Sequence, residues 1–141
     1  MKIIGIDHVA IAVDDLQPVL DLLAIFGLSM TSEEDLPDQG VKSTMVSAGN
    51  TQIELIQSMT EHSTIAKFMQ DRGPGLHHIC VEVDNLEEAI ETLLSQGMRL
   101  LDKVPRSDNA GRRVFLHPSS GQGMLMGIME RHPESGGDAN Q

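Results

Sequence analysis

The stretch HVAIAVDDLQPVLDLLAIFGL at residues 8–28 is repeated, without a gap and 70 residues further on, as HICVEVDNLEEAIETLLSQGM at residues 78–98. The identical pairs include His8/His78, Val13/Val83, Asp14/Asp84, Leu16/Leu86, Leu23/Leu93 and Gly27/Gly97. In each copy a hydrophobic pattern of period two, typical of a strand, changes after an acidic turn to a helical pattern that ends at a glycine. The repeat therefore predicts two copies of one supersecondary unit.

Each copy is predicted to fold as β-α-β-β-β, which makes the chain an α+β protein built from two βαβββ modules. The helices are expected over residues 16–26, capped by Asp15, and 86–96, where Asn85 and Glu88 form a capping box; Gly27 and Gly97 end them. Further strands are predicted over residues 28–31, 42–48 and 52–56 in the first module, and over residues 99–103, 112–116 and 124–129 in the second.

A length of 141 residues suits one domain. We expect this domain to span residues 1–131, with module one at about 3–57, a linker helix at about 63–73 and module two at about 75–131. Ser63 or Thr64 is expected to cap the linker helix. Residues 132–141 are polar and lack a hydrophobic period, so they predict a flexible tail.

Composition excludes several classes of partner. The chain has 21 acidic and 10 basic residues, a net charge of −11, with three phenylalanines as its aromatic residues, so nucleic acid is not expected as a ligand. Its apolar runs fall short of the roughly 20 residues that span a membrane, and the N-terminus does not resemble a signal peptide. The single cysteine, Cys80, suits a reducing compartment. A cytoplasmic location is expected.

Strand alternation places three potential metal ligands on one face. Residues i and i+2 share a face, so His8 and its repeat partner His78 lie opposite the apolar side chains that cover the helices. Glu54, between Ile53 and Leu55, is expected to point the same way. Two imidazoles and a carboxylate are a typical ligand set for a divalent transition metal. The structural alternatives are hydrogen-bonded core histidines and a glutamate on an edge strand.

Several stretches resemble a known family, the vicinal oxygen chelate superfamily, which includes glyoxalase I and the extradiol dioxygenases. Within it the chain is most similar to the methylmalonyl-CoA epimerases. The similar stretches are IDHVAIAV at residues 6–13, PDQGV at 37–41, GNTQIEL at 49–55, STIAKF at 63–68, GLHHI at 75–79 and FLHPS at 115–119. The resemblance extends over nearly the whole chain, to Met129.

This resemblance implies a curled mixed sheet around a metal-binding cleft, and a homodimer. The implied cofactor is a divalent metal ion, with cobalt, manganese, nickel, zinc and iron as the candidates. Epimerases of this type chelate a malonyl-like thioester on the ion, which stabilises an enolate while carboxylates move the α-proton between its faces. The expected partner is a small-molecule substrate, with acyl-CoA thioesters among the candidates.

Carried over residue by residue, the resemblance makes His8, Glu54 and His78 the metal ligands. The family's fourth ligand and base is a glutamate at the position of Gly127, the repeat partner of Glu54. A second base position corresponds to Ser43. The resemblance therefore does not identify the catalytic base in this chain.

The loop from Lys103 to Arg113 holds four of the ten basic residues, namely Lys103, Arg106, Arg112 and Arg113. Through the resemblance it is predicted to lie near the cleft and to bind a carboxylate or CoA phosphates.

Three functional hypotheses follow. The first is an isomerase of the methylmalonyl-CoA epimerase type. The second is a related enzyme of different chemistry, such as a glyoxalase-like lyase or a dioxygenase, on a metal site with two histidines and one glutamate. The third is a non-catalytic protein that binds acyl-CoA or another small molecule.

Overall fold

The computed structural model describes residues 1–133, which fall into two compact units. The N-terminal unit comprises His8–His77, and the C-terminal unit comprises Met1–Asp7 together with the chain from His78 onward. The repeated segment therefore begins at His8 in the N-terminal unit and at His78 in the C-terminal unit. Residues 1–7 are held in the C-terminal unit by hydrogen bonds between Lys2 and Asp84 and by the ion pair of Asp7 with Arg131.

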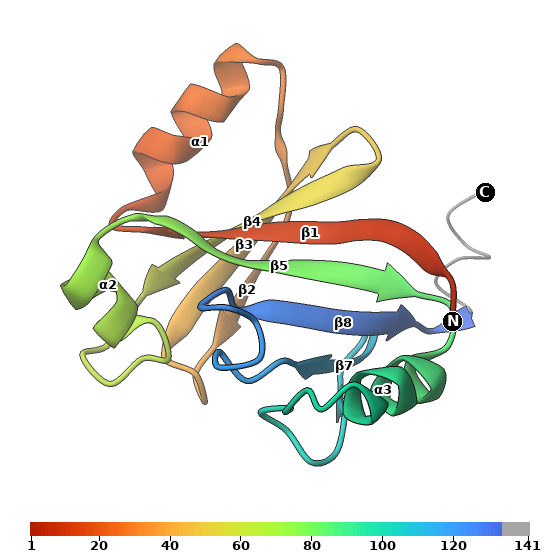
Figure 1. Ribbon diagram of the computed structural model, residues 1–141. Helices are drawn as coiled ribbons and strands as arrows, with labels where there is room; N and C mark the ends of the chain where they lie inside the picture. Colours follow the sequence, from red (N-terminus) through yellow and green to blue (C-terminus); the bar gives the residue numbers. More distant parts are fainter. Residues whose placement is uncertain (134–141) are drawn as a thin grey trace. The chain divides into compact units, whose positions relative to one another are not determined.

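The N-terminal unit has the predicted element order (Figure 1). Its elements are β1 (Ile3–Val13, shared with the C-terminal unit), α1 (Leu16–Ile25), β2 (Met30–Leu36), β3 (Val41–Ala48), β4 (Thr51–Ser58) and α2 (Ala66–Arg72). Its strands are ordered β2-β3-β4-β1, with β1 and β4 parallel and the other neighbours antiparallel.

The C-terminal unit repeats this topology. Its elements are β5 (Gly75–Val83), α3 (Leu86–Ser95), β6 (Arg106–Ser107), β7 (Gly111–Phe115) and β8 (Met126–Arg131). Its strands are ordered β5-β8-β7-β6, again with the first and last strands parallel. Even the register agrees, because Ala10 pairs with Glu54 and its repeat partner Cys80 pairs with Gly127. The predicted α+β class and the two βαβββ modules are confirmed.

Equivalent contacts fix the helix that crosses between the parallel strands of each unit. The side-chain oxygen of Gln57 accepts a hydrogen bond from the N–H of Leu16 at 3.0 Å, and that of Glu130 accepts one from Leu86 at 2.8 Å. Both acceptors lie on the last strand of their module and satisfy the first N–H of the helix. Each helix then buries an apolar face against its own sheet.

The predicted caps are largely confirmed. Asp15 accepts a hydrogen bond from Gln17, and Asn85 accepts one from Glu88. The Glu88 carboxylate, which was predicted to complete the capping box with Asn85, instead lies 3.2 Å from the N-terminal amine. Gly27 and Gly97 follow the helices with φ of 82° and 80°, the left-handed conformation that glycine adopts without strain. None of the helices in the described residues is long and apolar enough to cross a membrane.

Three predicted strands differ in place or in extent, and the last of them, β8, lies at Met126–Arg131 rather than at residues 124–129. The first strand after α1 lies at Met30–Leu36 rather than at residues 28–31. Over residues 99–103, the described chain forms a single bridge from Leu100 to Leu116, and the short β6 lies further on. The Asp108 side chain accepts hydrogen bonds from Ala110 and Gly111 in the turn that joins β6 to β7.

The linker helix and the start of the tail also differ from prediction. Helix α2 begins at Ala66 after Ile65, without a side-chain cap in the described structure, because the Ser63 hydroxyl instead bonds to that of Ser58 at 2.6 Å. His132 bonds through its backbone to Ala110 and through its ring to Asp108. His132, the first residue of the predicted tail, is therefore held by residues 108 and 110. Residues 134–141 of the predicted tail lie outside the described residues.

Replacement of Gly97 by alanine tests the left-handed helix end. A Cβ at Gly97 meets nothing within 4 Å, so the cost is conformational and we expect a loss of about 1 kcal/mol in the free energy of unfolding. Urea denaturation measures this loss. Gly5→Ala is the matched control, because a Cβ there is equally uncrowded and Gly5 lies in strand β1. Equal stability of the two variants would place the helix end elsewhere.

Candidate metal centre

His8 and Glu54 come together inside the N-terminal unit. His8 lies two residues before Ala10 on β1, and Ala10 pairs with Glu54 on β4, so both side chains point to the same face. The His8 Nε2 atom lies 3.4 Å from Glu54 Oε1, and His8 is 1% exposed. The prediction that these two residues share a face is confirmed.

Ser43 holds the other carboxylate oxygen of Glu54. Its hydroxyl on β3 donates a hydrogen bond to Glu54 Oε2 at 2.7 Å, and Ser43 is itself buried. Each oxygen of this carboxylate therefore faces a different neighbour, His8 on one side and Ser43 on the other. The proton of the Ser43 hydroxyl points to a carboxylate, an arrangement that orients Glu54.

His78 is buried on β5 in the C-terminal unit. Its imidazole meets the ring of Phe115 edge to face, with 5.3 Å between ring centroids and an interplanar angle of 89°. Such an aromatic contact fixes the orientation of the imidazole. His78 thus occupies, within its own unit, the strand position that His8 occupies in the other.

The donor atoms suit a divalent transition metal. His8, Glu54 and His78 each offer one ligand atom, a ring nitrogen or a carboxylate oxygen. Both imidazoles are at least nine-tenths buried, and a hydrogen bond orients the carboxylate, as is usual for a metal-binding carboxylate. The chemistry of these residues fits the ion that the sequence predicts.

Gly127 leaves space that an aromatic ring fills. It pairs with Cys80 on one side and with Phe115 on the other. A Cβ on Gly127 would lie 2.9 Å from Phe115 Cε1 and 3.1 Å from Cys80 Sγ, closer than real Cβ contacts normally come. The ring that contacts His78 therefore depends on the absence of a side chain at position 127.

Three of the four basic residues of the loop have acidic partners. Arg106 Nε lies 3.2 Å from Asp102, Arg113 lies 2.6 Å from Asp108, and Arg112 makes two hydrogen bonds to Glu87. The bond to Arg112 lowers the pKa of the Glu87 carboxyl, and the bond to Glu87 raises the pKa of Arg112. Three of the four predicted substrate-binding residues are thus already paired, a state that the sequence pattern did not indicate. Lys103 lies in the same loop, and it is exposed.

His77, the neighbour of His78 on β5, packs on helix α2. Its ring packs edge to face on Phe68 of α2, with 4.9 Å between centroids. Burial lowers the pKa of His77, while the negative charge of Glu54 opposes that shift. Only adjacency to His78 would have drawn attention to it in the sequence.

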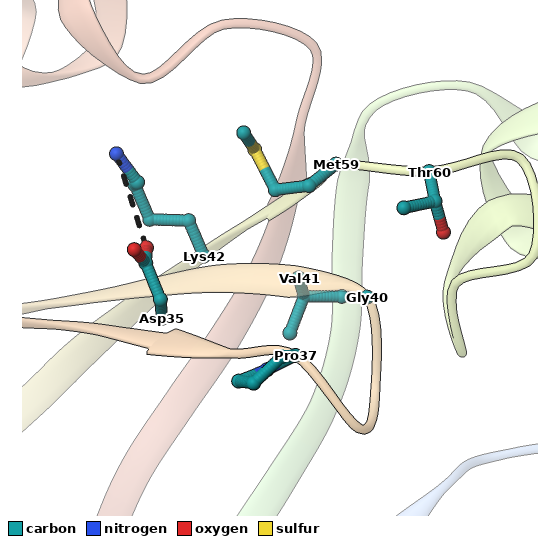
Figure 2. Close-up of a pocket in the computed structure, with 7 residues that line it drawn as sticks. All are labelled: Asp35, Pro37, Gly40, Val41, Lys42, Met59 and Thr60. Atoms are coloured by element: carbon teal, nitrogen blue, oxygen red, sulfur yellow. Dashed lines mark ion pairs between the residues drawn. The ribbon is translucent and has the colours of Figure 1, made fainter.

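A separate hollow of about 300 Å³ lies where the β2–β3 turn meets the segment after β4. Figure 2 shows its lining residues, which are Asp35, Pro37, Gly40, Val41, Lys42, Met59 and Thr60. The Lys42 amine lies 3.9 Å from Asp35 and 3.9 Å from Glu33, so its charge is already balanced. The hollow does not include the candidate ligands.

Comparison with known proteins identifies the family. A model of the Glyoxalase/Bleomycin resistance protein/Dioxygenase superfamily matches residues 7–115, and the chain belongs to this superfamily. It is 36% identical over 129 residues to the mitochondrial methylmalonyl-CoA epimerase of Dictyostelium discoideum, covering 89% of this chain and 78% of that protein.

Solved structures agree with this assignment. The crystal structure of methylmalonyl-CoA epimerase from Mycobacterium tuberculosis is 33% identical, with a TM-score of 0.86 over 96% of this chain and 93% of that one. A methylmalonyl-CoA epimerase in complex with methylmalonyl-CoA and NH4+ is 25% identical, with a TM-score of 0.82 over 94% of this chain and 97% of that one. The sequence resemblance is thereby confirmed.

A double-mutant cycle tests the packing of Phe115 over Gly127. We expect Gly127→Ala to destabilise the protein by about 1–3 kcal/mol, because the methyl group crowds the ring. Phe115→Leu removes the crowding atom, so Gly127→Ala should cost less in the Phe115→Leu background. Unfolding free energies of the four proteins measure this coupling. Strictly additive losses would show that the ring does not occupy this space.

Proposed function

We propose that the protein is a metal-dependent isomerase of the methylmalonyl-CoA epimerase type, acting on a 2-substituted malonyl-CoA thioester. The main support is the pair of buried His8 and half-buried Glu54, at 3.4 Å, in a chain that resembles such epimerases over most of its length. The epimerase that binds methylmalonyl-CoA shares this fold, which supports an acyl-CoA ligand.

We propose His8, Glu54 and His78 as the residues that hold the divalent ion. The exact repeat of His8 at His78, the shared face of His8 and Glu54, and the burial of both imidazoles support this set. When bound, such an ion supplies a Lewis acid that polarises the thioester carbonyl and so makes the α-proton more acidic.

The surroundings of Glu54 serve to orient and dehydrate it. Ser43 fixes one carboxylate oxygen, and the small side chains Ala10 and Ala12 on the neighbouring strand belong to a buried apolar cluster that excludes water. Electrostatic interactions are stronger in such surroundings than in solvent. Four basic residues remain candidates for substrate binding, namely Lys103, Arg106, Arg112 and Arg113. To bind a substrate, the three arginines would have to give up their acidic partners.

A second candidate function is a related enzyme of different chemistry. It is favoured by the two positions that the resemblance assigns to proton-moving glutamates, which here hold Ser43, bonded to Glu54, and Gly127, covered by Phe115. A site with two histidines and one carboxylate leaves coordination positions for a bidentate substrate. The third candidate is a non-catalytic protein that binds acyl-CoA, which experiment must distinguish from the two enzymes.

Proton exchange distinguishes these functions. We expect the metal-loaded protein to exchange the α-proton of methylmalonyl-CoA for deuterium in deuterated water, because the polarised thioester is a stronger carbon acid. Loss of the proton signal in NMR measures the exchange, with His8→Ala as the inactive control. Binding of the thioester without exchange would contradict epimerisation and leave the second and third candidates.

Metal analysis tests the ligand set independently of turnover. We expect about one divalent ion per chain in the purified protein, and its loss in His78→Ala, because a deleted ligand sharply lowers affinity. Elemental analysis after gel filtration provides the measurement. His62→Ala is the matched control, because the side chain of His62 is 86% exposed. Equal metal content in all three proteins would remove His78 from the site. The same gel filtration tests the predicted homodimer.

A further inference from the structure

Ser43, Glu54 and His8 form a row across three neighbouring strands of the N-terminal unit. The row runs from β3 through β4 to β1, with 2.7 Å between Ser43 and Glu54 and 3.4 Å between Glu54 and His8. Ser43 is 7% exposed, so bulk water does not compete for its hydroxyl. The two oxygens of Glu54 are thereby distinguished, one bonded to a neutral donor and one facing an imidazole.

Strand register explains why serine reaches the carboxylate. Met45 pairs with Glu54 and Ser43 pairs with Ile56, so Ser43 is the diagonal neighbour of Glu54 on the same face. Diagonal Cβ atoms in antiparallel strands lie roughly 7–8 Å apart or slightly less, a gap that a glutamate and a short hydroxyl side chain together span. Ala10, the partner of Glu54 on the other side, leaves the carboxylate free to turn toward Ser43.

We propose that Ser43 is a positioning residue that fixes Glu54 as a ligand through a single oxygen. Its hydroxyl engages Oε2, so that oxygen faces Ser43, while Oε1 faces His8 and is the oxygen offered to an ion there. This role replaces the base that the resemblance assigns to the same position, and it leaves one more coordination position for a bidentate substrate. The inference rests on the proposed function, because it concerns the same metal centre.

Metal affinity gives the first test. We expect Ser43→Ala to weaken binding of Co²⁺, measured by isothermal titration calorimetry, by about 10- to 100-fold, the usual effect of deleting a group that orients a ligand. Ser43→Thr keeps a hydroxyl and should restore affinity. Ser47→Ala is the matched control, because Ser47 is an exposed serine on the same strand and face. A merely structural role would lower the melting temperature of Ser43→Ala without changing the affinity of the folded protein, and would overturn the proposal.

Crystal structures without metal provide a second readout that separates this inference from the proposed function. We expect the Ser43 hydroxyl within hydrogen-bond distance of Glu54 in the wild-type protein and a rotated carboxylate in Ser43→Ala. If the wild-type protein binds no Co²⁺, the proposed metal centre fails, whereas the position of the carboxylate still decides the role of Ser43. An unmoved carboxylate in Ser43→Ala contradicts the inference whether or not metal binds.

Discussion

Parallel pairing between the first and last strands of each module is the constraint on which the rest of the structure depends. It requires a crossover, which α1 and α3 provide, and the last strand of each module holds the helix start through Gln57 or Glu130. The same pairing sets Ala10 beside Glu54 and Cys80 beside Gly127. The register of the parallel strands thus determines which residue positions lie side by side.

Side chains make the two modules chemically unequal on this common backbone. In the N-terminal unit, the paired position carries Glu54, oriented by Ser43 and facing His8. In the C-terminal unit, the equivalent position is Gly127, and the Phe115 ring fills the space and packs on His78. One module therefore supplies a carboxylate and an imidazole, and the other an imidazole held by an aromatic ring.

Much of this arrangement could be predicted from the sequence, because it depends on periodicity. The repeat predicted the modules, both crossover helices, the caps Asp15 and Asn85, and the shared face of His8 and Glu54. Long-range contacts carry no such local signal. Alternation shows which face Ser43 occupies without indicating its bond to Glu54, and Glu87 lies 25 residues from the Arg112 that it neutralises. Residues 99–103 have strand-like composition, yet they form a single bridge.

The central claim is that this chain holds a divalent ion with His8, Glu54 and His78. Anomalous diffraction from crystals grown with Co²⁺ tests it most directly, because the cobalt signal locates the ion without assumptions about the reaction. The account predicts one strong anomalous peak per chain. The cobalt ion at that peak should be bonded to the imidazoles of His8 and His78 and to a single oxygen of Glu54. A fully ordered site without a peak, or a peak bonded elsewhere on the chain, would contradict it.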